Sequence, residues 1–189
     1  MKGEEKMSIN LEKGSKINLT KIDKTLKNLN LCLGWDTRMD LDAFAILLDE
    51  NDKIIKTVCY ANKSFNGVNL SGDNLTGEGD GDDEIIYIKL NELPKSVKKI
   101  SLFANIFMAI FTTFQDVNGA FVRLVNGENN KELARYDLND KERKYSAFHF
   151  ANVLVKDNEL EFEIVGRGLN GSISKVEKYI RNGSIPYKS

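Results

Sequence analysis

Short apolar segments alternate with polar turns along most of this 189-residue chain. Residues 43–48 form a continuous apolar run, and a polar turn at 49–52 leads into a returning segment that ends at Tyr60. This arrangement predicts a hairpin whose strands are covered on both faces. The same pattern predicts further strands at residues 9–11, 16–19, 29–33, 85–90, 119–125, 131–138, 148–155 and 160–165, and a core strand that enters a bend within 100–111.

The turns between these strands define the expected topology. Residues 9–11 and 16–19 flank Gly14 and are predicted to form a first hairpin. Later hairpin turns are predicted at 126–130 and at 156–158. Repeated short strands, polar turns and only two prolines favour a mainly β fold, namely an antiparallel β-sandwich with a few short helices.

One helix is predicted at 172–180. Ile173, Val176 and Ile180 recur there at helical spacing, and Ser172 is a candidate N-cap. We expect this helix to pack on the sandwich or to serve as a partner surface. The glycines just before it, in 166–171, match the dinucleotide-binding pattern, but no complete helix, second strand and ribose-binding acid follow them, so we interpret them as structural.

Composition and charge narrow the class of protein. A hydrophobic content of 41% is typical of a packed globule, and a net charge of −1 provides no general attraction to nucleic acid. No apolar run reaches the length needed to cross a bilayer, and residues 1–6 contain no apolar stretch that could act as a secretion signal. We therefore expect a charged tail at 1–6, a single domain at 7–189 and a cytoplasmic location without a transmembrane segment.

The cysteines and the single histidine indicate structural roles. Cys32 and Cys59 each lie in an apolar, strand-like setting and form no redox or metal-binding spacing, which predicts buried, reduced thiols. His149 lies among aromatic residues, and no serine or cysteine nucleophile motif accompanies it. We therefore expect His149 to be a hydrogen-bonded, structural residue on a strand.

The most unusual stretch is 72–84, which holds six carboxylates and four glycines but no basic residue. Carboxylates gathered in one loop repel one another, by about 4 kcal/mol for a pair ~4 Å apart in a partly screened site. Gly77, Gly79 and Gly81 alternate with acidic residues and allow the positive φ values of a tight, oxygen-lined turn. Calcium takes six to eight oxygen ligands in such settings, so the pattern predicts Ca²⁺ binding.

The predicted ligands come mainly from this stretch. An EF-hand is excluded because Leu75 and Glu78 occupy the positions that need an oxygen ligand and a glycine. The carboxylates expected to bind the ions are those of Asp73, Glu78, Asp80, Asp82, Asp83 and Glu84. Secondary ligands are Asn74 and the backbone carbonyls of Leu75, Gly77 or Gly79. The flanking run after Glu84 is β-branched and aromatic, which predicts that the acidic loop is set on β-structure at one end of the sandwich.

A second acidic group precedes the first long apolar run. Asp36, Asp40 and Asp42 belong to it, and Asp40 and Asp42 would point to one side of an extended chain. One hypothesis is that these three carboxylates meet the main loop and complete one of two calcium sites. Turn-capping aspartates are the alternative.

The acidic stretch 72–84 resembles the signature of the TerD family, the tellurium-resistance and general stress proteins of bacteria. Other matching segments follow in the family's order, at 7–14, 33–36, 40–43, 120–124 and 132–138. The resemblance covers about residues 7–170. It implies a calcium-binding β-sandwich with stress-linked roles, no established catalytic activity, and partners among other tellurium-resistance proteins at the inner membrane face.

Two further function classes stay open at this point. A calcium-dependent, lectin-like or phosphate-binding module would need an ion with an open coordination position beside an aromatic residue such as Trp35. A metal-dependent hydrolase would use an acidic pair of metal sites, but the sequence provides no nearby histidine and no recognisable nucleophile. The leading hypothesis is a non-enzymatic calcium-binding stress protein.

Overall fold

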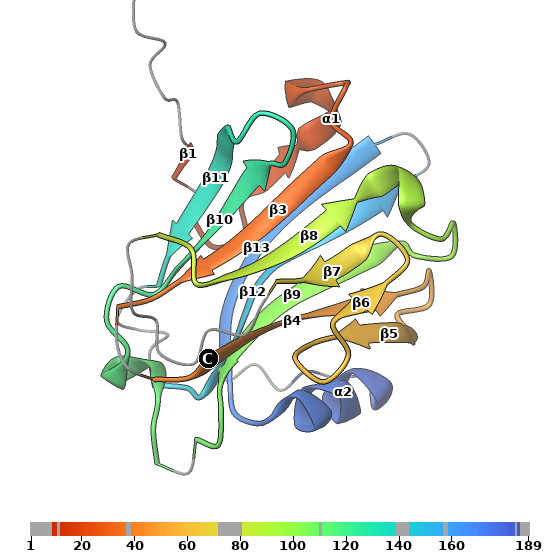
Figure 1. Ribbon diagram of the computed structural model, residues 1–189. Helices are drawn as coiled ribbons and strands as arrows, with labels where there is room; N and C mark the ends of the chain where they lie inside the picture. The colour runs from red at the N-terminus through yellow and green to blue at the C-terminus, as the bar shows by residue number, and fades with distance from the viewer. Residues whose placement is uncertain are drawn as a thin grey trace, which may run out of the picture.

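Two β-sheets packed face to face form the body of the protein (Figure 1). The structure is a computed structural model, and it describes residues 9–10, 12–36, 39–71, 81–109, 111–138, 144–156, 159–183 and 185. Neighbouring strands are antiparallel in both sheets, apart from the parallel pair β1 and β11. The predicted mainly β sandwich is therefore confirmed.

Each sheet combines strands from distant parts of the chain. In order from one edge to the other, the seven-stranded sheet contains β1 (Ile9–Asn10), β11 (Glu132–Asp137), β10 (Phe121–Asn126), β3 (Asn28–Gly34), β8 (Glu84–Lys89), β7 (Val68–Leu70) and β6 (Ser64–Phe65). In the same sense, the six-stranded sheet contains β2 (Lys16–Asn18), β13 (Glu159–Leu169), β12 (Ala147–Lys156), β9 (Lys99–Ile106), β4 (Leu41–Leu48) and β5 (Ile54–Val58). The helices are α1 (Leu19–Ile22), α2 (Ile173–Arg181) and the 3₁₀ turns η1 (Leu90–Glu92) and η2 (Phe114–Asp116).

Strand β4 shows why the apolar run at 43–48 is continuous. Side chains alternate along a strand, so Ala43, Ala45 and Leu47 face the core between the two sheets, whereas Phe44 and Ile46 face outward. Helix α2 covers this outer face, and every residue of β4 is buried. The hairpin of β4 and β5 is confirmed, as are the hairpins of β10 with β11 and β12 with β13.

The helix predicted at 172–180 is also confirmed. Ser172 occupies its N-cap position, although the hydroxyl of Ser172 bonds the hydroxyl of Ser174 and caps no backbone N–H. Val176 is fully buried against the six-stranded sheet, and Ile173 and Ile180 pack beside it. The helix therefore rests on the sandwich through the apolar stripe that its spacing predicted.

The predicted first hairpin is wrong, because its two strands lie in different sheets. Strand β1 pairs in parallel with β11, whereas β2 pairs with β13 in the opposite sheet. Gly14, at φ +83°, lies between them, and its N–H donates to the Ile164 carbonyl oxygen at 2.8 Å. The turn at Gly14 thus carries the chain from one sheet to the other, and each short strand pairs with a longer strand of its own sheet.

Several loops meet at one end of the sandwich. The register pairs Leu33 at the end of β3 with Glu84 at the start of β8. It likewise pairs Leu41 at the start of β4 with Ile106 at the end of β9. The described residues 35–36, 39–40, 81–83, 107–109 and 111–113 therefore lie at the same end of the sandwich, toward the lower left of Figure 1.

Candidate metal centre

The last two residues of the acidic stretch are attached to the 35–43 segment by two hydrogen bonds. The carboxylate of Asp83 accepts the backbone N–H of Trp35 at 2.9 Å, and the Asp83 N–H donates to the Leu33 carbonyl oxygen at 2.9 Å. The carboxylate of Glu84 accepts the backbone N–H of Ala43 on β4, which belongs to the opposite sheet. Asp83 and Glu84, at the end of the acidic stretch, are thereby attached to the segment that holds the second acidic group.

Glu84 is a buried charge at this junction. It is only 1% exposed, and it shares the inward side of β8 with Ile86 and Ile88. A carboxylate taken out of water costs several kcal/mol unless hydrogen bonds or a cation stabilise it. The Ala43 N–H is one such partner, and a bound cation would be another.

The three aspartates of the first acidic segment do not share one environment. Asp36 is exposed, and its backbone N–H donates to the Asn118 carbonyl oxygen at 2.8 Å. Asp40 is half-buried just before β4, and its backbone carbonyl accepts the N–H of Phe107 at 2.9 Å. Asp42 is 3% exposed, and its carboxylate accepts the side-chain amide of Asn105 at 3.4 Å. Asp42 thus lies on the outward face of β4, on the side opposite to Ala43.

Asp82 is held by a cation that the sequence analysis did not single out. Arg123 donates from Nε and Nη2 to the two carboxylate oxygens of Asp82, at 2.7 Å each, and from Nη1 to Glu132 at 3.3 Å. The hydrogen bonds to Asp82 raise the pKa of Arg123 above its ordinary value. The sequence does show a lone arginine in the otherwise apolar strand 120–124, which could have marked a buried ion pair. A local pattern does not identify the partner of that arginine.

A buried thiol lies near this ion pair. Burial, with a smaller effect of the Asp82 charge, raises the pKa of Cys32 to about 12. The Cys32 thiol therefore stays protonated at neutral pH and is a poor metal ligand. Cys32 and Cys59 are both buried and not disulfide-bonded, as predicted.

The remaining predicted ligands lie outside the described residues. These are Asp73, Asn74, Leu75, Gly77, Glu78, Gly79 and Asp80. Across the parts of the chain that the structure does describe, no group of three or more Asp, Glu, His or Cys side chains is arranged to hold a metal ion. Gly81, at φ +120°, is the first described residue after 72–80, and its carbonyl oxygen lies 2.6 Å from the point where a Cβ on Gly34 would be. Gly81 therefore lies directly over the end of β3.

Trp35 is a structural residue and is not an exposed aromatic platform. It is 3% exposed, and its indole N–H donates to the Met39 carbonyl oxygen at 2.9 Å. This contact joins Trp35, just after β3, to Met39, just before β4. The lectin-like alternative that placed Trp35 beside an open ion is therefore wrong about this residue.

His149 and the glycines of 166–171 are structural, as expected. His149 is 4% exposed and stacks on Phe103 with ring centroids 4.1 Å apart. Its Nε2 lies 2.9 Å from Asn152 Oδ1. Gly166 and Gly168 both lie within β13, and a Cβ on Gly168 would fall 1.8 Å from the ring of Tyr145. The glycine at 168 thus makes room for a tyrosine.

The fold defines a β-sandwich protein in which residues 81–84, the described end of the acidic stretch, meet the 35–43 segment. The model of the TerD domain family matches residues 7–179, and the chain therefore belongs to the TerD family. It is 40% identical over 183 residues to the tellurium resistance protein TerD of Serratia marcescens, covering 90% of this chain and 95% of that relative. It is 36% identical over 184 residues to general stress protein 16U of Bacillus subtilis (strain 168), with the same coverages of 90% and 95%.

Solved structures agree with the fold. A crystal structure of a homologue of telluride resistance protein (TerD) from Streptomyces coelicolor A3(2) superposes with a TM-score of 0.69. It shares 21% sequence identity, over 80% of this chain and 95% of that chain. At this identity the likeness shows the architecture alone. Among the described residues, no helix is long and apolar enough to cross a membrane.

Proposed function

We propose that this chain is a non-enzymatic, calcium-binding stress-response protein whose acidic end binds about two Ca²⁺ ions. The observation that carries the proposal is the pair of hydrogen bonds from Asp83 to the Trp35 N–H and from Glu84 to the Ala43 N–H. They attach the end of the acidic stretch to both ends of the 35–43 segment. Carboxylates from two distant parts of the sequence are thereby available to the same ions.

The donor chemistry fits a hard divalent ion. Calcium prefers carboxylate, amide and carbonyl oxygens, which are the groups in 72–84 and 35–42. The nearby thiol of Cys32 is no competing ligand, because its raised pKa of about 12 keeps it protonated. Bound calcium would supply the positive charge that so many close carboxylates require.

The described carboxylates are not equally suited to the ions. We assign the carboxylates of Asp36, Asp40, Asp83 and Glu84 to the ligand set, together with the donors of 73–80. Asp82 fits less well, because both of its oxygens accept hydrogen bonds from Arg123. We do not assign Asp42 to the ligand set, because its carboxylate lies on the outward face of β4 and accepts the side-chain amide of Asn105.

The names of the relatives suggest the physiological role. Tellurium resistance and general stress are named for the proteins of Serratia marcescens and Bacillus subtilis. We extend both roles to this chain, acting in the cytoplasm with other tellurium-resistance proteins at the inner membrane face. The non-enzymatic assignment is supported by His149, the single histidine of the chain, which is buried and does not serve as a solvent-accessible general base.

Calcium titration of the chelator-stripped full chain tests the proposal. Binding should raise the free energy of unfolding by about 2.7 kcal/mol for each ion site when free calcium is about a hundredfold above its dissociation constant. For a chain of this size, that corresponds to an increase in melting temperature of roughly 5–10 °C. Calorimetry and elemental analysis would give the number of bound ions.

Paired variants make the test specific to the acidic end. Asp73→Asn with Asp80→Asn should abolish or strongly weaken the thermal shift. The matched control, Asp52→Asn with Glu92→Gln, removes two carboxylates that are 68% and 51% exposed beyond the far ends of β4 and β8. The control should keep the full shift. An unchanged melting temperature together with no bound ion in the wild-type protein would refute the proposal.

A further inference from the structure

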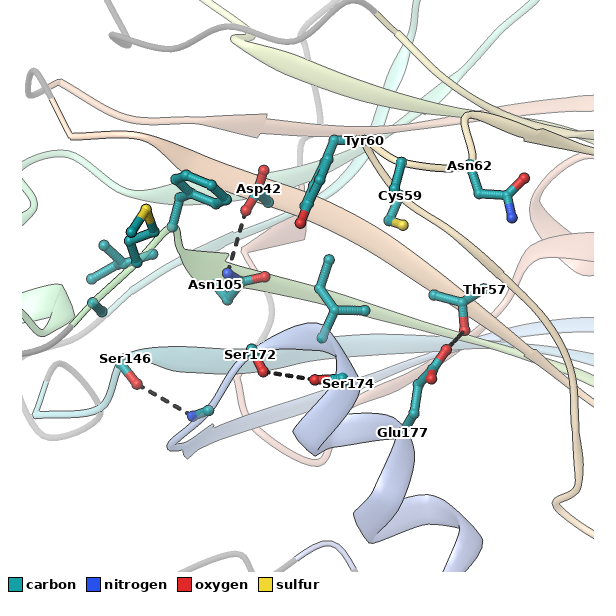
Figure 2. A pocket seen from close by; sticks show the side chains of 17 residues that line it. Asp42, Thr57, Cys59, Tyr60, Asn62, Asn105, Ser146, Ser172, Ser174 and Glu177 are labelled. Atoms are coloured by element: carbon teal, nitrogen blue, oxygen red, sulfur yellow. Dashed lines mark hydrogen bonds between the residues drawn. The ribbon is translucent and has the colours of Figure 1, made fainter.

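A cavity of about 620 Å³ lies between the six-stranded sheet and the N-terminal turn of α2 (Figure 2). It opens on the outward face of β4, β5 and β9, away from the Ala43–Glu84 contact. Its volume falls within the range of small-molecule sites in proteins. Among the described residues that line it, Asp42 and Glu177 are charged, and none is Lys, Arg or His.

The floor of the cavity presents a hydrogen-bond acceptor. Asn105 is 4% exposed, and its Nδ2 donates to Asp42 Oδ2 at 3.4 Å. Its Oδ1 is buried and has no hydrogen-bond partner among the described residues. A buried acceptor without a partner destabilises the fold, because it has lost its hydrogen bonds to water. A group that donates a hydrogen bond and enters the floor would remove this cost.

The mouth of the cavity is aromatic and apolar. Tyr60 and Phe107 meet edge to face, with ring centroids 5.9 Å apart, and they are 41% and 42% exposed. Ile173 at the start of α2 and Met108 add apolar surface. Aromatic faces attract cations as well as apolar groups, so this rim suits a ligand that combines both.

A second carboxylate occupies the helix side. Glu177 accepts the hydroxyl hydrogen of Thr57 on β5, which orients its carboxylate beside the cavity (Figure 2). The N-terminus of α2 borders the same space and carries about half a positive charge. Arg181, which is not part of the lining, lies 3.8 Å from the Glu177 carboxylate and offsets part of its charge. Asp42 and Glu177 together still leave a net negative charge beside the half charge of the helix, so the cavity favours a cation over an anion.

We propose that this cavity binds a small organic amine. Its ammonium group donates to Asn105 Oδ1 within the field of Asp42 and Glu177, and its apolar body lies against Tyr60, Phe107 and Ile173. An anion would meet two carboxylates and no basic residue among the described lining side chains. A bare metal ion would leave the aromatic rim without a role. The cavity lies at the same end of the sandwich as the proposed calcium ligands but on the outward face of β4, and of the sequence-predicted calcium ligands only Asp42 lines it.

Three probes with one apolar body and different charges test the proposal. Calorimetric titration at neutral pH would use 2-phenylethylamine, the neutral 2-phenylethanol and the anionic phenylacetate against the full chain. The amine should bind at least about tenfold more tightly than the alcohol, and phenylacetate should not bind. Equal binding of amine and alcohol, or no binding of the amine at millimolar concentrations, would overturn the proposal.

Wall and rim variants are preferable to Asn105 variants, because changing buried Asn105 could unfold the chain. Glu177→Gln retains an acceptor for Thr57 and should weaken amine binding about two- to fivefold. Its control is Glu163→Gln, since the two side chains are 27% and 26% exposed. Tyr60→Ala should weaken binding to a similar degree. Its control is Tyr87→Ala, an aromatic residue that is 39% exposed on the other sheet.

The titrations test the amine site independently of the calcium proposal. The titrations are run first with chelator and then with calcium, and Asp42 is left unchanged in every variant. Amine binding in chelator would stand even if the chain bound no calcium. Equal losses in a cavity variant and its control would show that binding occurs elsewhere and would reject the site.

Discussion

Replacing His149 by Gln should alter how the stability of the protein depends on pH. His149 is the single histidine of the chain, so the His149→Gln variant has no imidazole left to titrate. In the fold, the ring is 4% exposed and stacked on Phe103. Burial lowers the pKa of His149 from 6.5 to about 4, and the hydrogen bond with Asn152 offsets only part of that effect.

The sign and size of the effect follow from proton linkage. Between pH 6.5 and about 4, the unfolded chain binds a proton at His149 that the folded chain does not bind. Acidification therefore favours unfolding through this group. The free energy of unfolding should fall by about 2 kcal/mol from pH 7 to pH 5, and by about 3 kcal/mol once the pH lies below 4.

Urea unfolding of the wild type and of His149→Gln across this pH range is the assay. The variant has lost a buried hydrogen bond, so the quantity to compare is the change in stability with pH and not the stability itself. Carboxylates such as Glu163, whose pKa is lowered in the fold, contribute stability that is lost at lower pH in both proteins. Parallel pH profiles for the two proteins would refute the assignment of a neutral, buried His149.

Two further predictions concern packing and thiol chemistry. Gly168→Ala should lower the free energy of unfolding by about 1–3 kcal/mol, because its Cβ would lie 1.8 Å from the buried ring of Tyr145. Urea unfolding would measure this, and a change below about 0.5 kcal/mol would contradict it. In a Cys59→Ser background, Cys32 should resist alkylation by iodoacetamide at pH 8 until urea is added, because its pKa is raised to about 12 and the thiol is 2% exposed. Labelling of the native chain at the rate of an exposed thiol would show this to be wrong.

Local patterns in the sequence were enough to predict most of the elements. The continuous apolar run of β4 arises because both of its faces are buried, and this run is visible without any partner. The apolar stripe of Ile173, Val176 and Ile180 predicts α2, because helical spacing is likewise visible in the sequence without knowledge of any partner. Short polar turns predict the hairpins, because adjacent strands joined by such turns pair with each other.

The sequence also singled out the acidic chemistry, because crowded carboxylates between glycines form a local pattern. It did not predict how the described members are arranged. Asp82 bonds Arg123 from a strand 41 residues away, and Glu84 reaches the Ala43 N–H across the two sheets. Trp35 looked available as a binding surface, but it is covered in the fold.

The difference between local patterns and distant contacts also explains why the two N-terminal strands were predicted correctly but their pairing was not. Alternation around Gly14 marked two short strands, but their partners are β11 and β13, in opposite sheets. The amino-acid sequence by itself determined most of the strands, the helix on the sheet and the oxygen-rich stretch, since each depends on neighbouring residues, but it did not predict the short edge strands β6 and β7. Only the tertiary structure decided which strands pair, which carboxylates meet and where a cavity opens, because those contacts join residues distant along the chain through the register and packing of the two sheets.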